Sequence, residues 1–313
     1  MNNLFKFLII FVFIGLQAAN VTAQDSPVQV SYKVNSNKTV DFSFTKPDPG
    51  TFTVVLAFTN LTNSYDAEQS TLTAKDYSGN LKTLTPSNKE QGIGFSYKYS
   101  YIRGKLNPKY NADFVYLLPF KKGTKVKAVE SSFVNATYFG STTPDDWKVY
   151  RFFTQAEDTV TAVRKGLVVS IKDLYETNTN AEVAYTSQTN ELMIEHADGT
   201  LATYRGFKKG SLAVKLGQTV FPGTPLAVAA KAGASGRSSI ALLITYLKSA
   251  EFGTADNQSF KTSKSYYGFI TPKFCTTENA AVVLVPQQEY TAADSPEIIR
   301  KEFTKKELKL AAK

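Results

Sequence analysis

Short runs of alternating apolar and polar residues fill the first third of the chain. These runs lie at 28–34, 39–44, 51–58, 72–75, 81–84 and 93–101. Turn-forming clusters such as Pro47-Asp48-Pro49-Gly50 separate them. Strands of this length with Gly, Pro and Asn between them are typical of an antiparallel β-sandwich. The pattern therefore predicts a sandwich domain over 24–110. Its expected inward-facing side chains are Phe42, Phe44, Val54, Leu56, Phe58 and Tyr97.

A second series of strands follows a break in the pattern. Residues 103–112 contain Gly, Pro and Asn at positions that interrupt both the helical and the strand period, so a domain boundary is expected there. From 198 to 247, short apolar runs alternate with Gly or Pro, as in a meander of antiparallel strands. Asp198-Gly199 predicts a tight hairpin turn between strands at 192–194 and 201–204. The chain is thus expected to be all-β.

The last residues have a helical pattern. Ser295 suits the N-cap, Pro296 the first turn, and Glu297 the positive end of the helix dipole. A partial apolar stripe runs through the segment between lysines. The sequence therefore predicts a C-terminal amphipathic helix over 295–313. We expect it to dock on the protein, with a basic tail that seeks a wall or membrane surface as the alternative.

The N-terminus has the features of an export signal. Lys6 precedes an apolar run at 7–16, and the small-residue motif Val21-Thr22-Ala23 follows. The run is shorter than the roughly 20 apolar residues that a membrane span needs. The pattern predicts a cleavable signal peptide over 1–23, cut after Ala23, and no transmembrane span in the mature chain. The protein is therefore expected to be periplasmic or secreted.

Charge and cysteine content narrow the class of partner. The formal net charge is +9, which suits an anionic surface such as a cell wall, although a soluble surface rich in lysine explains it equally well. Export and the lack of an arginine-rich helix argue against nucleic acid. The single cysteine, Cys275, has no partner for an intramolecular disulfide and is expected to be a small buried residue.

Residues 116–247 carry motifs in an order that resembles a known family. The motifs are Tyr116–Gly123, Val160–Val169, Tyr204, Lys208–Ser211, Val214–Val220, Gly223 and Ser235–Ser239. This order is similar to the core of lysostaphin/LytM-type zinc endopeptidases, which have the duplicated hybrid motif fold and cut peptide cross-links in bacterial cell walls. The resemblance implies a LytM-like antiparallel β-sheet domain over 112–290.

The same resemblance implies that the zinc site is degenerate. The family binds zinc through a His, an Asp and the second His of a His-x-His pair, and leaves one position for water. This chain has one histidine, His196, which falls at the predicted hairpin turn and is expected to be exposed. Only Asp145 and Asp146 lie where the first ligand would fall. The resemblance places other residue types at the remaining positions of the site, namely Arg151, Gly206, Leu242 and Ile244.

No metal, cofactor or catalytic residue is therefore expected, and the resemblance implies a pseudoenzyme. The first hypothesis is an exported module whose old substrate groove binds peptidoglycan or an envelope protein, such as a wall hydrolase that it regulates. Its candidate binding residues are Tyr204, Arg205 and Tyr246, and Arg151 or Arg205 is expected to pair with a carboxylate. Alternatively, Leu242 and Ile244 fill the groove as core.

Two hypotheses from other classes remain open. An active cell-wall metallopeptidase with an altered site would need ligands recruited from the carboxylates of the chain. A structural or adhesion protein of the envelope would act through the N-terminal sandwich. Metal content distinguishes the altered metallopeptidase from the binding module. Truncation near Lys109 distinguishes the adhesion protein, because binding would then stay with the N-terminal piece.

Overall fold

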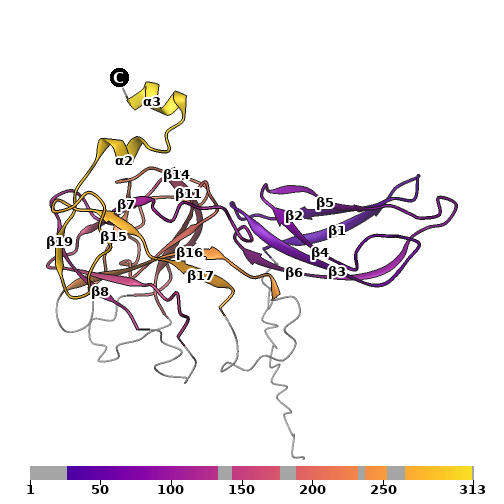
Figure 1. The fold of residues 1–313 in the computed structure, drawn as a ribbon, viewed down its shortest axis with the longest axis horizontal. Coiled ribbons are helices and arrows are strands. Elements are labelled where there is room, and N and C mark those ends of the chain that lie inside the picture. The colour runs from indigo at the N-terminus through magenta and orange to yellow at the C-terminus, as the bar shows by residue number, and fades with distance from the viewer. Residues whose placement is uncertain (1–26, 133–142, 177–187, 232–236, 252–264, 312–313) are drawn as a thin grey trace, which may run out of the picture.

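The computed structural model describes residues 27–132, 143–176, 188–231, 237–251 and 265–311. The described chain is almost entirely β-structure with two short helices, α2 and α3, near its C-terminus. It forms two bodies that lie side by side, with the helices beyond the second body (Figure 1). The predicted signal peptide lies outside the described residues. Within them, no helix is long and apolar enough to cross a membrane.

The N-terminal body is a sandwich of two antiparallel sheets. Its strands are β1 (Gln29–Val34), β2 (Val40–Thr45), β3 (Phe52–Thr62), β4 (Gln69–Ala74), β5 (Ser78–Leu84) and β6 (Gly94–Arg103). One sheet has the order β1-β2-β5 and the other the order β4-β3-β6. The predicted inward-facing residues line the core between them, and only Tyr97 is partly exposed, because β6 is an edge strand.

The second body is built around a nine-stranded sheet. Its strands are β7 (Val115–Leu117), β8 (Lys125–Glu130), β9 (Tyr150–Thr154), β10 (Thr159–Thr161), β11 (Gly166–Lys172), β12 (Glu191–Glu195), β13 (Leu201–Arg205), β14 (Thr219–Val220), β15 (Pro225–Val228), β16 (Ser238–Leu247), β17 (Tyr267–Ile270), β18 (Lys273–Cys275) and β19 (Glu289–Thr291). The main sheet has the order β14-β11-β12-β13-β16-β9-β8-β19, and β17 also pairs with β16.

The remaining strands of this body close its core. β10 pairs with β15, and β7 pairs with β18 in parallel. The hydrophobic core lies on one face of the main sheet, and Cys275 is buried as expected. The predicted hairpin is confirmed as β12 and β13, with Gly199 at a φ of +90° in the turn. The all-β fold class is likewise confirmed.

The C-terminal segment forms two helices and not one continuous helix. The helices are α2 (Pro296–Arg300) and α3 (Lys305–Ala311). As predicted, the side chain of Ser295 caps α2 by accepting a hydrogen bond from the amide of Ile298. Thr304 then starts α3 with a capping box, in which its amide donates to the Glu307 carboxylate at 2.6 Å. The break between the helices brings Phe303 against the ring of Phe221, at a centroid distance of 5.1 Å.

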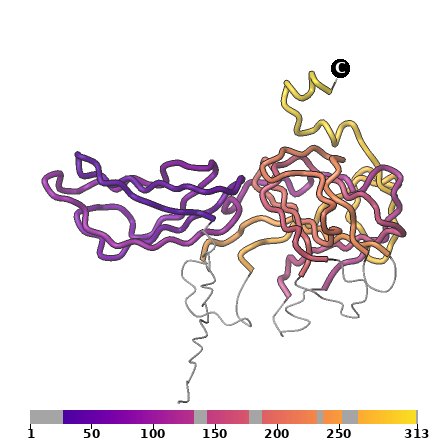
Figure 2. Tube along the Cα trace, turned by 180° about the vertical axis from the view of Figure 1, so that it is seen from behind, coloured from indigo at the N-terminus to yellow at the C-terminus, as the bar shows by residue number. Residues whose placement is uncertain are grey.

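The two bodies are joined by specific contacts as well as by the chain. Thr51 donates two hydrogen bonds to the Glu195 carboxylate, from its amide at 2.7 Å and from its hydroxyl at 2.5 Å. The Tyr267 hydroxyl donates to the Arg103 carbonyl at 2.6 Å. Figure 2, seen from behind, shows the same end of the sandwich against the second body. The relative placement of the bodies is therefore fixed by hydrogen bonds across the junction.

Gly50 makes this junction sensitive to a single methyl group. It has a φ of +81°, and a Cβ added there would lie 2.6 Å from the Glu195 carboxylate and would also meet Val169. Gly210 has a φ of +70° with open space around it. Gly50→Ala is therefore expected to lower the free energy of unfolding by about 1–2 kcal/mol more than Gly210→Ala, which reports backbone strain alone. Urea denaturation of both variants measures the difference, and equal losses would contradict the junction contact.

Candidate functional site

Two arginines lie on the face of the main sheet that is turned away from the core. Arg151 of β9 is the cross-strand partner of Ala241 in β16, and Ala241 is in turn the partner of Arg205 in β13. Directly paired residues project from the same face of a sheet. Because neighbouring strands lie about 4.8 Å apart, the backbones that carry the two arginines are roughly 10 Å apart. Ala241 lies between them with a small side chain that is 5% exposed.

Arg151 is the less compensated of the two cations. Its Nη1 donates to the Ser239 hydroxyl at 3.1 Å. Burial of the partly exposed side chain lowers the pKa of the guanidinium. Among the residues that the structure describes, no carboxylate contacts it. A guanidinium has five N–H donors, so most of the donors of Arg151 have no partner among the described residues.

Arg205 already has a partner. Its Nε donates to a Glu191 carboxylate oxygen at 3.0 Å, and half of its side-chain surface is exposed. Glu191 is the next cross-strand partner in the same row. An exposed ion pair of this kind contributes little to stability, since water screens it. Arg205 is therefore available to exchange Glu191 for a ligand at small energetic cost.

Leu242 and Ile244 lie on the opposite face of β16 from Arg151. Leu242 is the cross-strand partner of Tyr150 and Tyr204, and both leucine and isoleucine are 1% exposed in the hydrophobic core. The expectation that they line an open groove is therefore wrong, and the alternative of core residues holds. On the face turned away from the core, β16 presents Ala241 and Leu243, which are one residue away in register.

Tyr204 is also a core residue and not a partner-binding one. Its side chain is fully buried, and its hydroxyl accepts a hydrogen bond from the Val163 amide at 2.9 Å. Burial raises the pKa of this hydroxyl. Tyr246 is partly buried and packs against Tyr110, at a centroid distance of 5.0 Å. Only Arg205 of the three predicted binding residues is well exposed on the outer face.

Gly206 follows β13 and has a structural reason to be glycine. Its φ is +104°, and an added Cβ would lie 2.9 Å from the Ser239 carbonyl oxygen. Its own carbonyl accepts a hydrogen bond from the Ala230 amide at 2.8 Å. Gly206 therefore lies close to Arg151 through Ser239, but it contributes backbone to this part of the site and no side chain.

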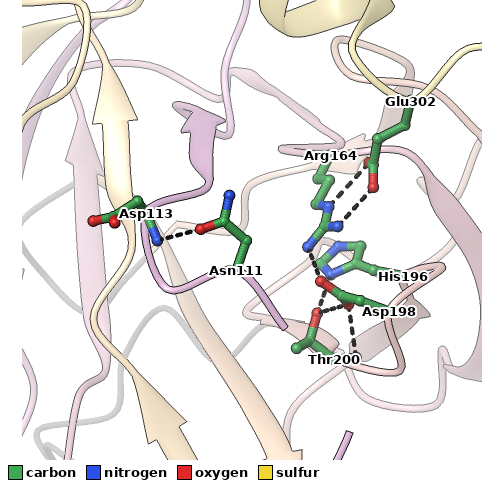
Figure 3. Close-up of polar contacts among 7 residues, drawn as sticks. All are labelled: Asn111, Asp113, Arg164, His196, Asp198, Thr200 and Glu302. Carbon is green, nitrogen blue, oxygen red and sulfur yellow. Dashed lines mark hydrogen bonds and ion pairs between the residues drawn. The ribbon is translucent and has the colours of Figure 1, made fainter. Parts of the chain in front are cut away.

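His196 is buried, and the expectation of an exposed turn residue is wrong. It is 2% exposed, and its Nδ1 lies 2.9 Å from the Thr200 hydroxyl, which donates to the Asp198 carboxylate at 2.7 Å (Figure 3). An ionised carboxylate only accepts, so the Thr200 proton points at Asp198 and Nδ1 must carry a hydrogen. The other nitrogen, Nε2, is then an unprotonated acceptor, and no described residue donates a hydrogen bond to it.

Arg164 holds this turn to the C-terminal segment. Its Nη1 donates to Asp198 at 2.8 Å, while Nε and Nη2 donate to the two oxygens of Glu302 at 3.0 and 2.6 Å (Figure 3). The guanidinium is 4% exposed and lies 3.8 Å from the centre of the Phe114 ring. Three segments far apart in the sequence thus share one buried cation. Sequence reasoning missed this network, since no local pattern signals its long-range partners.

The carboxylates near the expected first ligand position have other roles. Asp146 accepts a hydrogen bond from the Phe269 amide at 3.0 Å and lies 3.4 Å from the Lys248 ammonium. Asp145 is exposed. Within the described ranges, no three His, Cys, Asp or Glu side chains come together in a group able to hold a metal ion.

Comparisons with known proteins give only distant likenesses. No protein-family model and no curated protein matches the chain. Among solved structures, the M23 metalloprotease pseudoalterin from the deep sea is similar with 17% identity over 58% of this chain and 97% of its own, at a TM-score of 0.31. A putative M23 peptidase from Pseudomonas aeruginosa is 12% identical over 64% of this chain and 89% of its own, at a TM-score of 0.28.

A third structure is similar over a larger part of this chain. The zinc-containing peptidase from Vibrio cholerae is 12% identical over 69% of this chain and 74% of its own, at a TM-score of 0.31. Each of these is a likeness at low identity. The function proposed below therefore rests on the side chains of this chain and on the sequence motifs.

Proposed function

We propose that the chain is an exported, non-catalytic relative of cell-wall zinc endopeptidases, and that it binds carboxylate-bearing peptides of peptidoglycan on the outer face of its main sheet. The observation that carries this proposal is the state of Arg151. It is a desolvated guanidinium with one hydrogen bond, to Ser239, and no carboxylate partner among the described residues. Partial removal of a cation from water without a counter-charge costs free energy, and a bound carboxylate offsets that cost.

The geometry around Arg151 suits a carboxylate. Guanidinium groups bind carboxylates through two parallel N–H···O bonds, which fix orientation as well as affinity. Arg205 lies on the same face across Ala241, within reach of a second acidic group on an extended peptide. Wall peptides carry free carboxylates, whereas neutral glycan chains do not. An acidic loop of an envelope protein is the alternative ligand with the same chemistry.

The residues of this face also support a non-catalytic role. Zinc hydrolysis needs three ligands with lone pairs and a bound water whose pKa the metal lowers. Arg151 offers only donors and a positive charge, and the side chains of Ala241 and Leu243 on the outer face of β16 offer no lone pair. The single histidine is held in the buried network with Thr200 and Asp198. The face is thus chemically suited to binding an anion.

Sedimentation with insoluble peptidoglycan tests the proposal. Wild-type mature protein is expected to bind saturably. Arg151→Gln is expected to bind about tenfold more weakly, because it removes one charge-assisted, two-point contact. Arg300→Gln is a matched control, since Arg300 is exposed in the last turn of α2 and far from the outer face in sequence and fold. Its binding should equal that of the wild type.

Two results would overturn the proposal. The first is stoichiometric zinc in protein purified without chelator, together with cleavage of cross-linked peptidoglycan. The second is equal binding by wild type and Arg151→Gln, which would place wall binding elsewhere, with the N-terminal sandwich as the next candidate. Binding to an acidic envelope protein but not to peptidoglycan, still weakened by Arg151→Gln, would reassign the ligand and keep the site.

A further inference from the structure

A pocket of about 540 Å³ lies between the two bodies. Its volume falls within the range of small-molecule sites, which occur preferentially at domain interfaces. The hydrogen bonds from Thr51 to Glu195 hold its two sides together without a ligand. The lining residues are Lys46, Pro49–Thr51, Lys75–Tyr77, Lys165–Leu167, Glu195–Ala197, Thr219 and Glu302. The pocket is on a different part of the molecule from Arg151, which is absent from this lining.

Two of the three carboxylates in the pocket are already occupied by the protein. Both oxygens of Glu195 accept hydrogen bonds from Thr51. Both oxygens of Glu302 accept from the Arg164 guanidinium. Only Asp76, which is exposed, keeps free carboxylate oxygens within the described structure. The acidic residues of the pocket are therefore mostly unavailable to a ligand cation.

The ammonium groups of the pocket keep unused donors. Lys46 is 4% exposed and donates to the carbonyls of Asp48 at 2.8 Å and Gly50 at 2.7 Å. The carboxylates of Glu195, Asp48 and Asp76 favour its charge from nearby without a hydrogen bond to it. Lys165 donates to Glu307 and to the Glu302 carbonyl. Each ammonium has three N–H donors, so one donor on each lysine has no hydrogen-bond acceptor among the described residues. The Lys46 ammonium also lies over the rings of Phe52 and Tyr77, and that of Lys165 over the ring of Phe221.

Lys75 adds a third cation at the pocket. It is exposed and makes no hydrogen bond or ion pair with other described residues, so all three of its donors are free. The donors free for a ligand thus come from three ammonium groups. The acceptors free for a ligand among the described residues are the oxygens of Asp76, because the Nε2 atom of His196, although His196 lines the pocket, is itself buried.

The remaining wall of the pocket is largely apolar. It includes Pro49, Leu167 and Ala197, together with the ring of Tyr77, which is 59% exposed. Apolar walls with a few converging polar groups are the usual composition of a small-molecule site. A ligand that matches them has an apolar body and a compact anionic head.

We propose that this pocket binds a small organic carboxylate with an apolar body, whose carboxylate accepts hydrogen bonds from Lys46, Lys75 and Lys165. The body lies against Pro49, Leu167 and the Tyr77 ring. Such a ligand bridges the sandwich and the second body, since Lys46 and Lys75 belong to one and Lys165 to the other. The site is independent of the peptide-binding face around Arg151.

Calorimetric titration of the full mature chain tests the site with probes that share a six-carbon apolar chain and differ in the polar group at its end. Hexanoate is expected to bind saturably, while hexanol, hexylammonium and inorganic phosphate bind much more weakly. Lys75→Gln is expected to weaken hexanoate roughly fivefold through loss of one charge-assisted contact. Lys98→Gln is the matched control, because Lys98 is an exposed lysine of β6 outside the pocket.

A second variant tests the location directly. Thr219 lines the pocket and is exposed, so Thr219→Trp is expected to fill the space and abolish hexanoate binding while the melting temperature stays unchanged. Equal binding of hexanol or hexylammonium would overturn the choice of a carboxylate. No hexanoate binding by the wild type, or binding that neither variant changes, would overturn the site. None of these outcomes depends on peptidoglycan, so they are separate from the test of Arg151.

Discussion

Replacing Arg164 by methionine is expected to lower the free energy of unfolding by about 3–5 kcal/mol. The change removes the cation that Asp198 and Glu302 share, and it leaves two carboxylates that are only 15% and 19% exposed. Breaking a buried pair from one side costs more than the pair contributes, because the remaining charge stays desolvated. Urea denaturation followed by tryptophan fluorescence or circular dichroism measures the loss.

Arg205→Met is the control for this result. Arg205 also pairs with one carboxylate, but its side chain is 50% exposed, so water replaces the lost contact. We expect a change of less than about 1 kcal/mol. If Arg164→Met and Arg205→Met cost the same, the buried network does not stabilise the fold. Glu302→Gln should lie between the two, since it keeps the hydrogen-bonding shape and removes one charge.

Acidification is expected to destabilise the protein through its single histidine. Burial, and then the nearby Arg164 charge, lower the pKa of His196 from 6.5 to about 3 in the folded state. As the pH falls below 6.5, the imidazole of His196 therefore binds a proton in the unfolded chain but stays unprotonated in the folded chain. By linkage, the free energy of unfolding falls by about 2 kcal/mol between pH 7 and pH 5, and it continues to fall until the pH approaches 3.

The interval from pH 7 to pH 5 isolates this effect. The chain has one histidine, and carboxyl groups with lowered pKa values, such as Asp198 and Glu307, lose their contribution only below their usual range. His196→Gln removes the titrating group, so its free energy of unfolding should be nearly flat across the interval, whatever its absolute value. A wild type as flat as this variant would show that His196 is protonated without cost in the folded state.

Strands of the sandwich that have one polar face, such as β2, were predictable from the sequence. The alternation in residues 39–44 corresponds to β2, where Phe42 and Phe44 are buried and the residues between them are partly exposed. A period of two is a local property of the sequence, and turn clusters bound each run. The same logic located the hairpin of β12 and β13 from Asp198-Gly199 alone.

The face of β16 was not predictable in the same way. Most of its residues are buried on both faces, from Ser238 to Thr245, so the apolar run has no alternation to show which side chains point inward. A shift of one residue moves every side chain to the other face. The prediction that Leu242 and Ile244 line a groove assigned them to the wrong face of the sheet. The cross-strand pairing of Leu242 with Tyr150 and Tyr204 reveals the correct register.

The two arginines named from the sequence lie on one face, and their role in binding stays a prediction. Arg151 and Arg205 were named as carboxylate partners, and the structure places both on the outer face across Ala241. The burial of His196 was not visible, because a turn is usually exposed. What covers it comes from elsewhere in the chain, through Arg164 and the ring of Tyr116, whose centroid lies 6.0 Å from that of the imidazole. Contacts of this range have no local signature.

The junction between the two bodies also determines how far the protein reaches. A flexible linker would let the sandwich adopt many orientations relative to the second body. Here Thr51 bonds to Glu195, and Leu106 forms a bridge with Leu247 beside the main sheet. The longest strand of the sandwich, β3, has 11 residues, which corresponds to an arm of about 36 Å at the usual rise per residue. Anything that meets the tip of this arm is therefore held at a fixed spacing from whatever occupies the face around Arg151.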